Sequence, residues 1–288
     1  MVPEVAIVTD TTACIPGDKV AEYAIEVVPV QLVIDGKAYR DGIDLTATDF
    51  YKLLKQTKKL PTTAASSPEP YLEAYRKAGL RAKNILCITV PSRFSTLYNS
   101  ARLARDMFLA KSPGLLVEVI DCPTAAAGMG LVALAAARAA AAGKGPGETV
   151  EMVRELMPRV YLYAALDTLK YLAKSGRVPQ AAAMVNSVLD IKPVFTLNGT
   201  GAHTVALPRT MAGAIKRMLG LMAEKASREK PLHAAVMHAD ALDQALRLKK
   251  DITSLNYDVA DIFITEFTPV MGAHTGPGLV GVAFYSSL

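Results

Sequence analysis

The stretch 125–142 constrains the fold more than any other segment, because it is the longest apolar run and consists mainly of alanine. Gly128, Gly130 and Arg138 lie within it, and such a composition is weak for a membrane span, which favours large apolar side chains and excludes charge. We therefore expect a buried helix that packs closely through its small residues. Gly143 is expected to end this helix, since glycine is common just beyond a helix C-terminus.

The same stretch carries a loose match to a dinucleotide-binding motif. Residues 128–133 read G-x-G-x-x-A. In a true phosphate-binding loop the first glycine ends a strand, so that the pyrophosphate meets the N-terminus of the following helix. Here several residues separate the preceding predicted strand from Gly128. Close helix packing therefore explains the glycines better than nucleotide binding does.

Predicted strands and helices alternate through the first half of the chain. Asp35-Gly36, a strong hairpin signal, separates the runs 25–34 and 37–40. Alternation of strand and helix is typical of a parallel sheet with helices on both faces. We predict strands at 5–9, 85–90 and 115–121, and helices at 16–24, 44–56, 68–79, 95–110 and 124–142.

The second half mixes hairpins with helices, which favours an α+β domain with a mixed, largely antiparallel sheet. Lys144-Gly145-Pro146-Gly147 is the best candidate for a linker, so we predict an α/β domain at 1–147 and an α+β domain at 148–288. Asn198-Gly199 marks a second hairpin, and a strand, a loop and a strand close the chain. Further strands are predicted at 160–166, 191–197, 203–207 and 232–239, and helices at 168–174, 210–227 and 241–255.

The segment 272–281 contains four glycines and a proline, a composition that argues against a regular helix or an ordinary central strand. We expect a rigid loop that presents His274, followed by a strand over 279–285. Loops in such positions carry function more often than core segments do.

Composition and charge narrow the class of protein. The chain of 288 residues is 51% hydrophobic and 20% charged, which predicts a globular protein rather than a disordered one. Its net charge of +5 favours an anionic ligand or an acidic partner about as much as a generic basic surface, and no basic run resembles a nucleic-acid-binding arm. Cys14, Cys87 and Cys122 lie far apart and indicate reduced thiols. With no signal peptide recognised, a cytoplasmic location is expected.

Several common chemistries lack their motifs. The sequence has no P-loop and no G-x-S-x-G nucleophile elbow. Its four histidines show no metal-ligand spacing, so no metal site is predicted. Ser95, His274 and one of many aspartates would suffice for a catalytic triad, but chance alone provides such a set in a chain of this size.

Hydroxyl side chains stand out at two places. Thr62 and Thr63 follow Pro61 in a polar break, 61–67, between two predicted helices, where they either stabilise the loop or bind a ligand. Ser95 lies between a predicted strand and a predicted helix. A serine there caps the helix, and the free N–H groups at the same point also attract anions. Both roles are compatible.

Taken together, these residues resemble the DegV family, the fatty acid-binding proteins that serve as the lipid-carrying subunit of bacterial fatty acid kinase. The resemblance covers nearly the whole chain, and no single motif carries it. The matching segments, in order, are Val8-Thr9-Asp10-Thr11-Thr12, Val28-Pro29-Val30, Tyr39-Arg40-Asp41-Gly42, Pro61-Thr62-Thr63, Phe94-Ser95-Thr96-Leu97-Tyr98, Val119-Ile120-Asp121, Ser175-Gly176-Arg177, Ile191-Lys192-Pro193, Arg209-Thr210 and His274-Thr275-Gly276-Pro277-Gly278.

The resemblance implies a long-chain fatty acid, such as palmitate, stearate or oleate, held in a buried tunnel at the junction of two domains. It implies that Thr63 and Ser95 bind the carboxylate, and that His274, Arg209 and Thr62 help to position the head group or the transferred phosphoryl group. An ATP-dependent kinase subunit is the implied partner, which phosphorylates the acid to an acyl phosphate. The chain itself is then a carrier for phospholipid synthesis, with no cofactor, no nucleic-acid partner, no stable membrane insertion and no catalysis of its own.

Two segments depart from the family pattern. Ala64 replaces a serine after the threonines, and Thr96-Leu97 replaces Gly-Thr after Ser95. Both changes bear on the head-group geometry and on the acid that is preferred. A rival hypothesis is a hydrolase or transferase that acts on an acyl substrate through Ser95 or His274.

Overall fold

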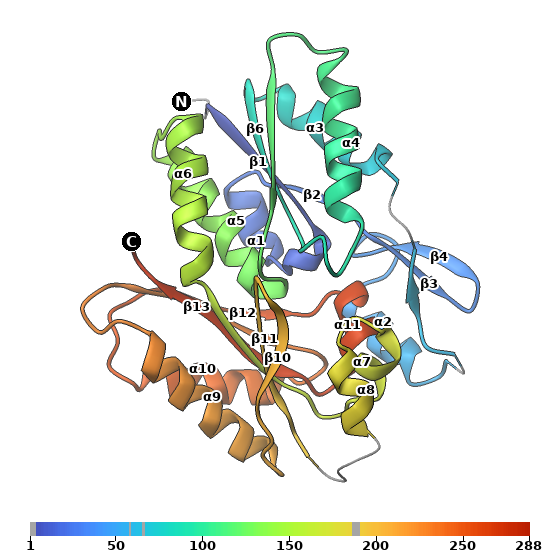
Figure 1. Cartoon of the computed structure of the whole chain (residues 1–288), viewed down its shortest axis with the longest axis vertical. Coiled ribbons are helices and arrows are strands. Elements are labelled where there is room, and N and C mark those ends of the chain that lie inside the picture. Colours follow the sequence, from blue (N-terminus) through green and yellow to red (C-terminus); the bar gives the residue numbers. More distant parts are fainter. Residues whose placement is uncertain (1–3, 58, 65–66, 186–190) are drawn as a thin grey trace.

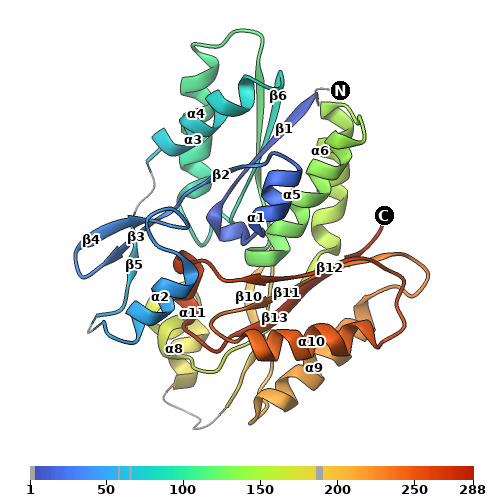
Figure 2. The same ribbon diagram turned by 180° about the vertical axis from the view of Figure 1, so that it is seen from behind.

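Three sheets organise the chain, as Figures 1 and 2 show from opposite sides. The structure is a computed structural model, and it describes residues 4–57, 59–64, 67–185 and 191–288. The architecture is α/β, with one parallel sheet and one mixed sheet. This agrees with the fold class that the sequence predicts.

The first sheet is parallel throughout, with the strand order β2-β1-β6-β7. Apolar side chains fill its strands, and all six residues of β1 are buried, as expected for a sheet that is covered on both faces. Its strands are β1 (Val5–Asp10), β2 (Glu26–Val28), β6 (Asn84–Thr89) and β7 (Leu116–Asp121).

Helices cover both faces of this parallel sheet (Figure 1). α3 (Glu69–Gly79) and α4 (Leu97–Leu109) pack against each other and against one face. α5 (Ala126–Ala141) and α6 (Pro146–Leu156) pack on the other. The predicted arrangement of helices on both faces is confirmed.

The second sheet is mixed and largely antiparallel, with the order β10-β9-β8-β13-β11-β12. Only β11 and β12 run parallel to each other within it. The hairpin predicted at Asn198-Gly199 joins β9 and β10. Its strands are β8 (Tyr161–Ala165), β9 (Val194–Asn198), β10 (Gly201–Ala206), β11 (Leu232–His238), β12 (Val259–Glu266) and β13 (Val280–Ser286).

A small third sheet projects beside the other two. It has the order β4-β3-β5 and consists of β3 (Gln31–Ile34), β4 (Lys37–Arg40) and the two-residue β5 (Thr62–Thr63). The predicted hairpin at Asp35-Gly36 is confirmed, and both turn residues have positive φ, 48° and 84°. This is the conformation of a type I′ turn. The run 25–34 is two strands in different sheets rather than one, because Pro29 interrupts it and cannot donate to a sheet.

The alanine-rich helix α5 lies between the parallel sheet and the mixed sheet. It contacts β1 and β6 on one side and β8, β11 and β13 on the other. All but two of its 16 residues are buried, the exceptions being Arg138 and Ala141. A Cβ atom on Gly130 would lie 2.5 Å from the carbonyl oxygen of Ala13. The expectation of a buried, tightly packed helix is therefore confirmed.

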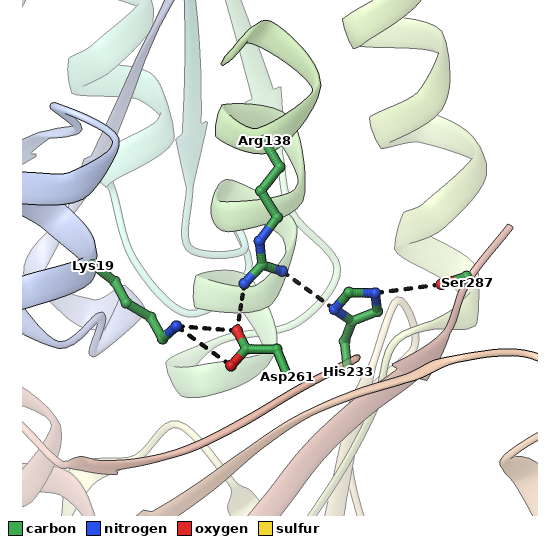
Figure 3. A network of polar contacts seen from close by, with 5 residues as sticks. All are labelled: Lys19, Arg138, His233, Asp261 and Ser287. Carbon is green, nitrogen blue, oxygen red and sulfur yellow. Dashed lines mark hydrogen bonds and ion pairs between the residues drawn. The ribbon is translucent and has the colours of Figure 1, made fainter. Parts of the chain in front are cut away.

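The one charged residue of α5 anchors a polar network that connects the two main sheets' layers (Figure 3). Arg138 forms an ion pair with Asp261 on β12 and donates to His233 Nδ1 on β11 at 3.3 Å. Lys19, on α1 (Gly17–Glu22), lies 3.1 Å from the same Asp261 carboxylate. Burial, and next to it the Arg138 charge, lower the pKa of His233, so the ring is neutral and its Nε2–H donates to Ser287.

The sequence predicts neither α6 nor α8. Pro146 is the first residue of α6, with Gly145 as its N-cap, so half of the segment predicted as a linker belongs to a helix. Proline suits that first position because its missing N–H would be unpaired there in any case. α8 (Pro179–Val185) also begins at a proline and packs on α7 (Lys170–Ser175). The domain boundary at residue 147 stays a prediction.

Replacing Gly130 by valine is expected to destabilise the protein by about 1–3 kcal/mol, because the added atoms meet the η1 backbone (Thr11–Ala13) and force the layers apart. Gly147→Val is the matched control, since no atom lies within 4 Å of the added Cβ there. Its effect should stay within about 0.5 kcal/mol. Urea unfolding of both variants measures the difference, and equal midpoints would contradict close packing at Gly130.

Candidate functional site

A cavity of about 600 Å³ lies where α2, α7 and α11 meet the small sheet. Its walls come from three segments: α2 (Ala47–Leu54) with the chain up to β5, α7 with the turn after it, and the end of α11 (Pro269–Thr275). The first segment belongs to the predicted N-terminal domain and the other two to the predicted C-terminal one. The volume is within the range of small-molecule sites.

Thr62 and Thr63 line this cavity from β5. The sequence predicts an irregular break at this point, but both residues pair with β3, Thr63 opposite Leu32 and Thr62 opposite Val33. The pairing fixes the backbone of the two threonines. Their side chains are thus presented by a sheet edge rather than by a free loop.

Arg177 is the closest polar partner of Thr63. Its Nη2 donates to Thr63 Oγ1 at 3.1 Å, and its Nη1 donates to the Ser175 carbonyl at 2.7 Å. Gly176 ends α7 with φ of 70°, which turns the chain so that Arg177 faces β5. Sequence reasoning places Arg177 in a family motif but assigns it no role in the site.

His274 also lines the cavity, from the last turn of α11. The sequence predicts a loop over 272–281, and this is wrong for residues 272–275, which are helical. Burial, and to a smaller extent the Arg177 charge, lower the pKa of His274 to about 4. The imidazole is therefore neutral near pH 7 and acts through hydrogen bonds rather than charge.

Close packing explains why a helix forms over these glycines. A Cβ on Gly272 would lie 2.6 Å from the Tyr51 hydroxyl and 2.8 Å from the Phe50 ring, so only glycine lets α11 rest on α2. Gly276 has φ of 73°, and its Cβ would lie 2.1 Å from the Tyr171 ring. Tertiary contacts thus outweigh the low helix propensity of glycine, and the predicted strand is confirmed as β13, one residue later.

Ser95 and Arg209 do not line the large cavity. The Ser95 hydroxyl accepts the N–H of Leu97 at 3.3 Å, but the N-cap of α4 is Thr96, which makes no side-chain cap hydrogen bond, so the prediction that Ser95 is the N-cap is wrong. Leu97 lines a much smaller cavity with Gln31 of β3, the residue before Leu32. Arg209 is exposed and precedes Thr210, the N-cap of α9 (Met211–Lys225). The head-group roles of Ser95 and Arg209 stay predictions.

A serine nucleophile would need a base at its hydroxyl. Among the residues that the structure describes, the Leu97 N–H is the hydrogen-bond partner of Ser95, and His274 is not. Within the same residues, no group of three or more His, Cys, Asp or Glu side chains gathers to hold a metal ion.

Asp41 supports the other end of α11. The residue is 1% exposed, and neither carboxylate oxygen has a hydrogen-bond partner of ordinary length among the described residues. Burial raises the pKa of Asp41 to about 6, although the Thr11 and Thr268 hydroxyls and the Val270 N–H oppose this shift. Thr268 and Val270 are at the start of α11, so this carboxyl group lies against the helix that carries His274.

Residues 4–287 match the model of the DegV family, whose description reads "Uncharacterised protein, DegV family". The chain belongs to the DegV family. A DegV domain-containing protein of Caldanaerobacter subterraneus is 32% identical over 287 residues, 98% of each chain.

Solved DegV structures share the fold. One is the structure described as fatty acid binding of a DegV family protein from Thermus thermophilus. It superposes with a TM-score of 0.91 at 27% identity and covers 99% of this chain and 100% of that one. DegV of Bacillus subtilis, described as a fatty acid binding protein, gives 0.88 at 28% identity with the same coverage. No helix in the described part of this chain is long and apolar enough to cross a membrane.

The Asp41 carboxyl makes stability depend on pH. Its pKa is about 6 in the fold against 3.8 as the ordinary value, so the folded protein binds the proton more tightly and loses stability as the pH rises through that window. Asp41→Asn removes this dependence. As the pH rises across this window, the free energy of unfolding of the wild type should fall by on the order of 3 kcal/mol relative to that of the variant. Urea titrations at several pH values measure it, and parallel profiles would contradict the assignment.

Proposed function

We propose that this DegV protein binds a long-chain fatty acid, such as palmitate, stearate or oleate, and presents its carboxylate to an ATP-dependent kinase subunit for conversion to an acyl phosphate. The observation that carries the proposal is the cavity that brings Thr62, Thr63, Arg177 and His274 together. The fatty acid binding described for the DegV proteins of Thermus thermophilus and Bacillus subtilis supports a fatty acid as the ligand.

The hydrogen bond between Arg177 and Thr63 prepares the hydroxyl for an anion. Since Thr63 Oγ1 accepts from Arg177, its own O–H is free to donate to a carboxylate oxygen. The guanidinium adds charge-assisted donors next to it. His274 is neutral and offers one ring N–H as a further donor. We propose that Ser95 completes the head-group site, although Ala64 supplies no hydroxyl at the neighbouring position.

Affinity would come mainly from the acyl chain. Burying about 14 methylenes at about 0.8 kcal/mol each gives on the order of 11 kcal/mol before the cost of immobilisation. The polar groups then set the orientation, because a buried carboxylate without donors is strongly unfavourable. Leu54, Leu60 and Ala273 provide the apolar wall next to the polar group. We propose that the acyl chain of the fatty acid continues from this wall into a tunnel between the N-terminal and C-terminal halves of the protein.

In this proposal the bound carboxylate is the nucleophile of the phosphoryl transfer. The protein presents it and need not catalyse the reaction itself. The Thr63 and His274 donors are neutral and leave a carboxylate oxygen able to attack a phosphoryl group, and the sequence has no P-loop to bind ATP. The partner kinase would therefore bring the nucleotide. Arg177 and His274 would share the charge that develops on transfer.

Mass spectrometry of an organic extract of the purified protein tests the ligand directly. We expect a long-chain fatty acid in the wild-type extract and several-fold less per protein in Thr63→Ala/Ser95→Ala. The single variants separate the two hydroxyls, and Thr253→Ala, at the exposed end of α10 (Leu242–Thr253), is the threonine control away from the cavity. An extract without fatty acid, or equal loading of the double variant, would count against the proposal.

His274→Ala is expected to impair phosphoryl transfer more than binding, because a neutral donor contributes most when charge develops on the transferred group. The rate of acyl phosphate formation with a fatty acid kinase subunit should fall by about 10-fold or more. Retention of the acid should change little. A normal transfer rate would refute this role for His274.

A further inference from the structure

The lining of the cavity carries more positive charges than the single negative charge of a carboxylate would balance. Among the residues that the structure describes, five cationic side chains and no aspartate or glutamate line the cavity: Lys55, Lys59, Lys170, Lys174 and Arg177. Lys55 is paired with Asp240 at 3.0 Å, and Arg177 is occupied by the oxygens of Thr63 and Ser175. The other three lysines form no ion pair with any residue that the structure describes.

Two of these three lysines, Lys170 and Lys174, repel each other unless an anion is bound. Lys170 and Lys174 are four residues apart on the six-residue helix α7, and like charges at this spacing destabilise a helix. Both line the cavity together with Tyr171 of the same helix, and Lys59 lines it from the segment between α2 and β5. All three lysines are exposed, so their ammonium groups can contact a bound anion without being buried.

We infer that Lys59, Lys170 and Lys174 form a subsite for a phosphate dianion, which makes the site bind the acyl phosphate more tightly than the free acid. This inference rests on the proposed function. In that reaction the carboxylate oxygen forms a bond to the terminal phosphorus of ATP, the bond from that phosphorus to the bridging oxygen breaks, and ADP leaves. The bound head group thereby changes from a monoanion to a dianion.

In the proposed complex, different residues of the cavity bind the carboxyl end and the phosphoryl group. Thr63, Arg177 and His274 hold the carboxyl end, and the added phosphoryl group extends from it toward the lysines that also line the cavity. Lysine binds phosphate as a point charge and needs no fixed orientation. The free acid leaves these lysines without an anionic partner, whereas the phosphorylated product engages them. The subsite thus favours the product over the substrate after transfer.

Two lipids of equal chain length test the subsite without a kinase: palmitate and hexadecylphosphonate, a stable dianion at mildly alkaline pH. At low ionic strength the wild type should prefer the phosphonate. Lys170→Gln/Lys174→Gln should lower phosphonate affinity by about tenfold and leave palmitate affinity unchanged, an effect expected of two exposed charge pairs. Salt should abolish the preference, since it screens exposed charges.

Lys249→Gln/Lys250→Gln on α10 (Leu242–Thr253) is the matched control, because it removes the same charge from a surface away from the cavity. It should keep the preference. Equal wild-type affinity for both lipids, or an unchanged preference in the α7 variant, would overturn the subsite alone, as long as palmitate binds. A wild type that binds neither lipid would instead overturn the proposed function.

Discussion

The fold depends on one helix that has no polar face. All residues of α5 except Arg138 and Ala141 are buried, so this helix must be covered by other elements, and the two large sheets pack against it. Alanine and glycine keep its diameter small, and Gly130 brings it within contact of the η1 backbone. Arg138, whose side chain is 25% exposed, reaches out of this layer to Asp261 and His233. A chain with this helix is therefore restricted to a layered architecture in which both sheets share a common centre.

The site follows from that arrangement. While α5 fixes the parallel sheet against the mixed sheet, α11 contacts both α7 and β5 of the small sheet, and the cavity lies where these segments meet. Three of the cavity's polar residues come from these three segments, Thr63, Arg177 and His274. None of them is close to another in sequence. The arrangement supplies a hydroxyl, a guanidinium and a neutral imidazole at one place, a set that suits a negatively charged head group.

The sequence predicts the sheets better than the cavity walls. Apolar strands and the turns Asp35-Gly36 and Asn198-Gly199 are local signals, and they were sufficient for the fold class and both hairpins. The helix over 269–275 was missed because its glycines are explained by contacts with Tyr51 and Tyr171, far away along the chain. Arg177 lacked an assigned role for the same reason: its contact with Thr63 spans 114 residues. Thr63 and His274 were singled out by local patterns, a polar break and a glycine-rich segment, and only their head-group roles came from the family resemblance.

That long-range hydrogen bond has a mechanical consequence. Thr63 is held by the small sheet, whereas Arg177 follows a six-residue helix that rests on α11. An anion that accepts from both residues cross-links two segments which are otherwise joined at this point by a single exposed contact. If the proposed fatty acid binds there, it should tighten this part of the protein, and the α7–α8 turn should then resist proteolysis better with the ligand bound than without it.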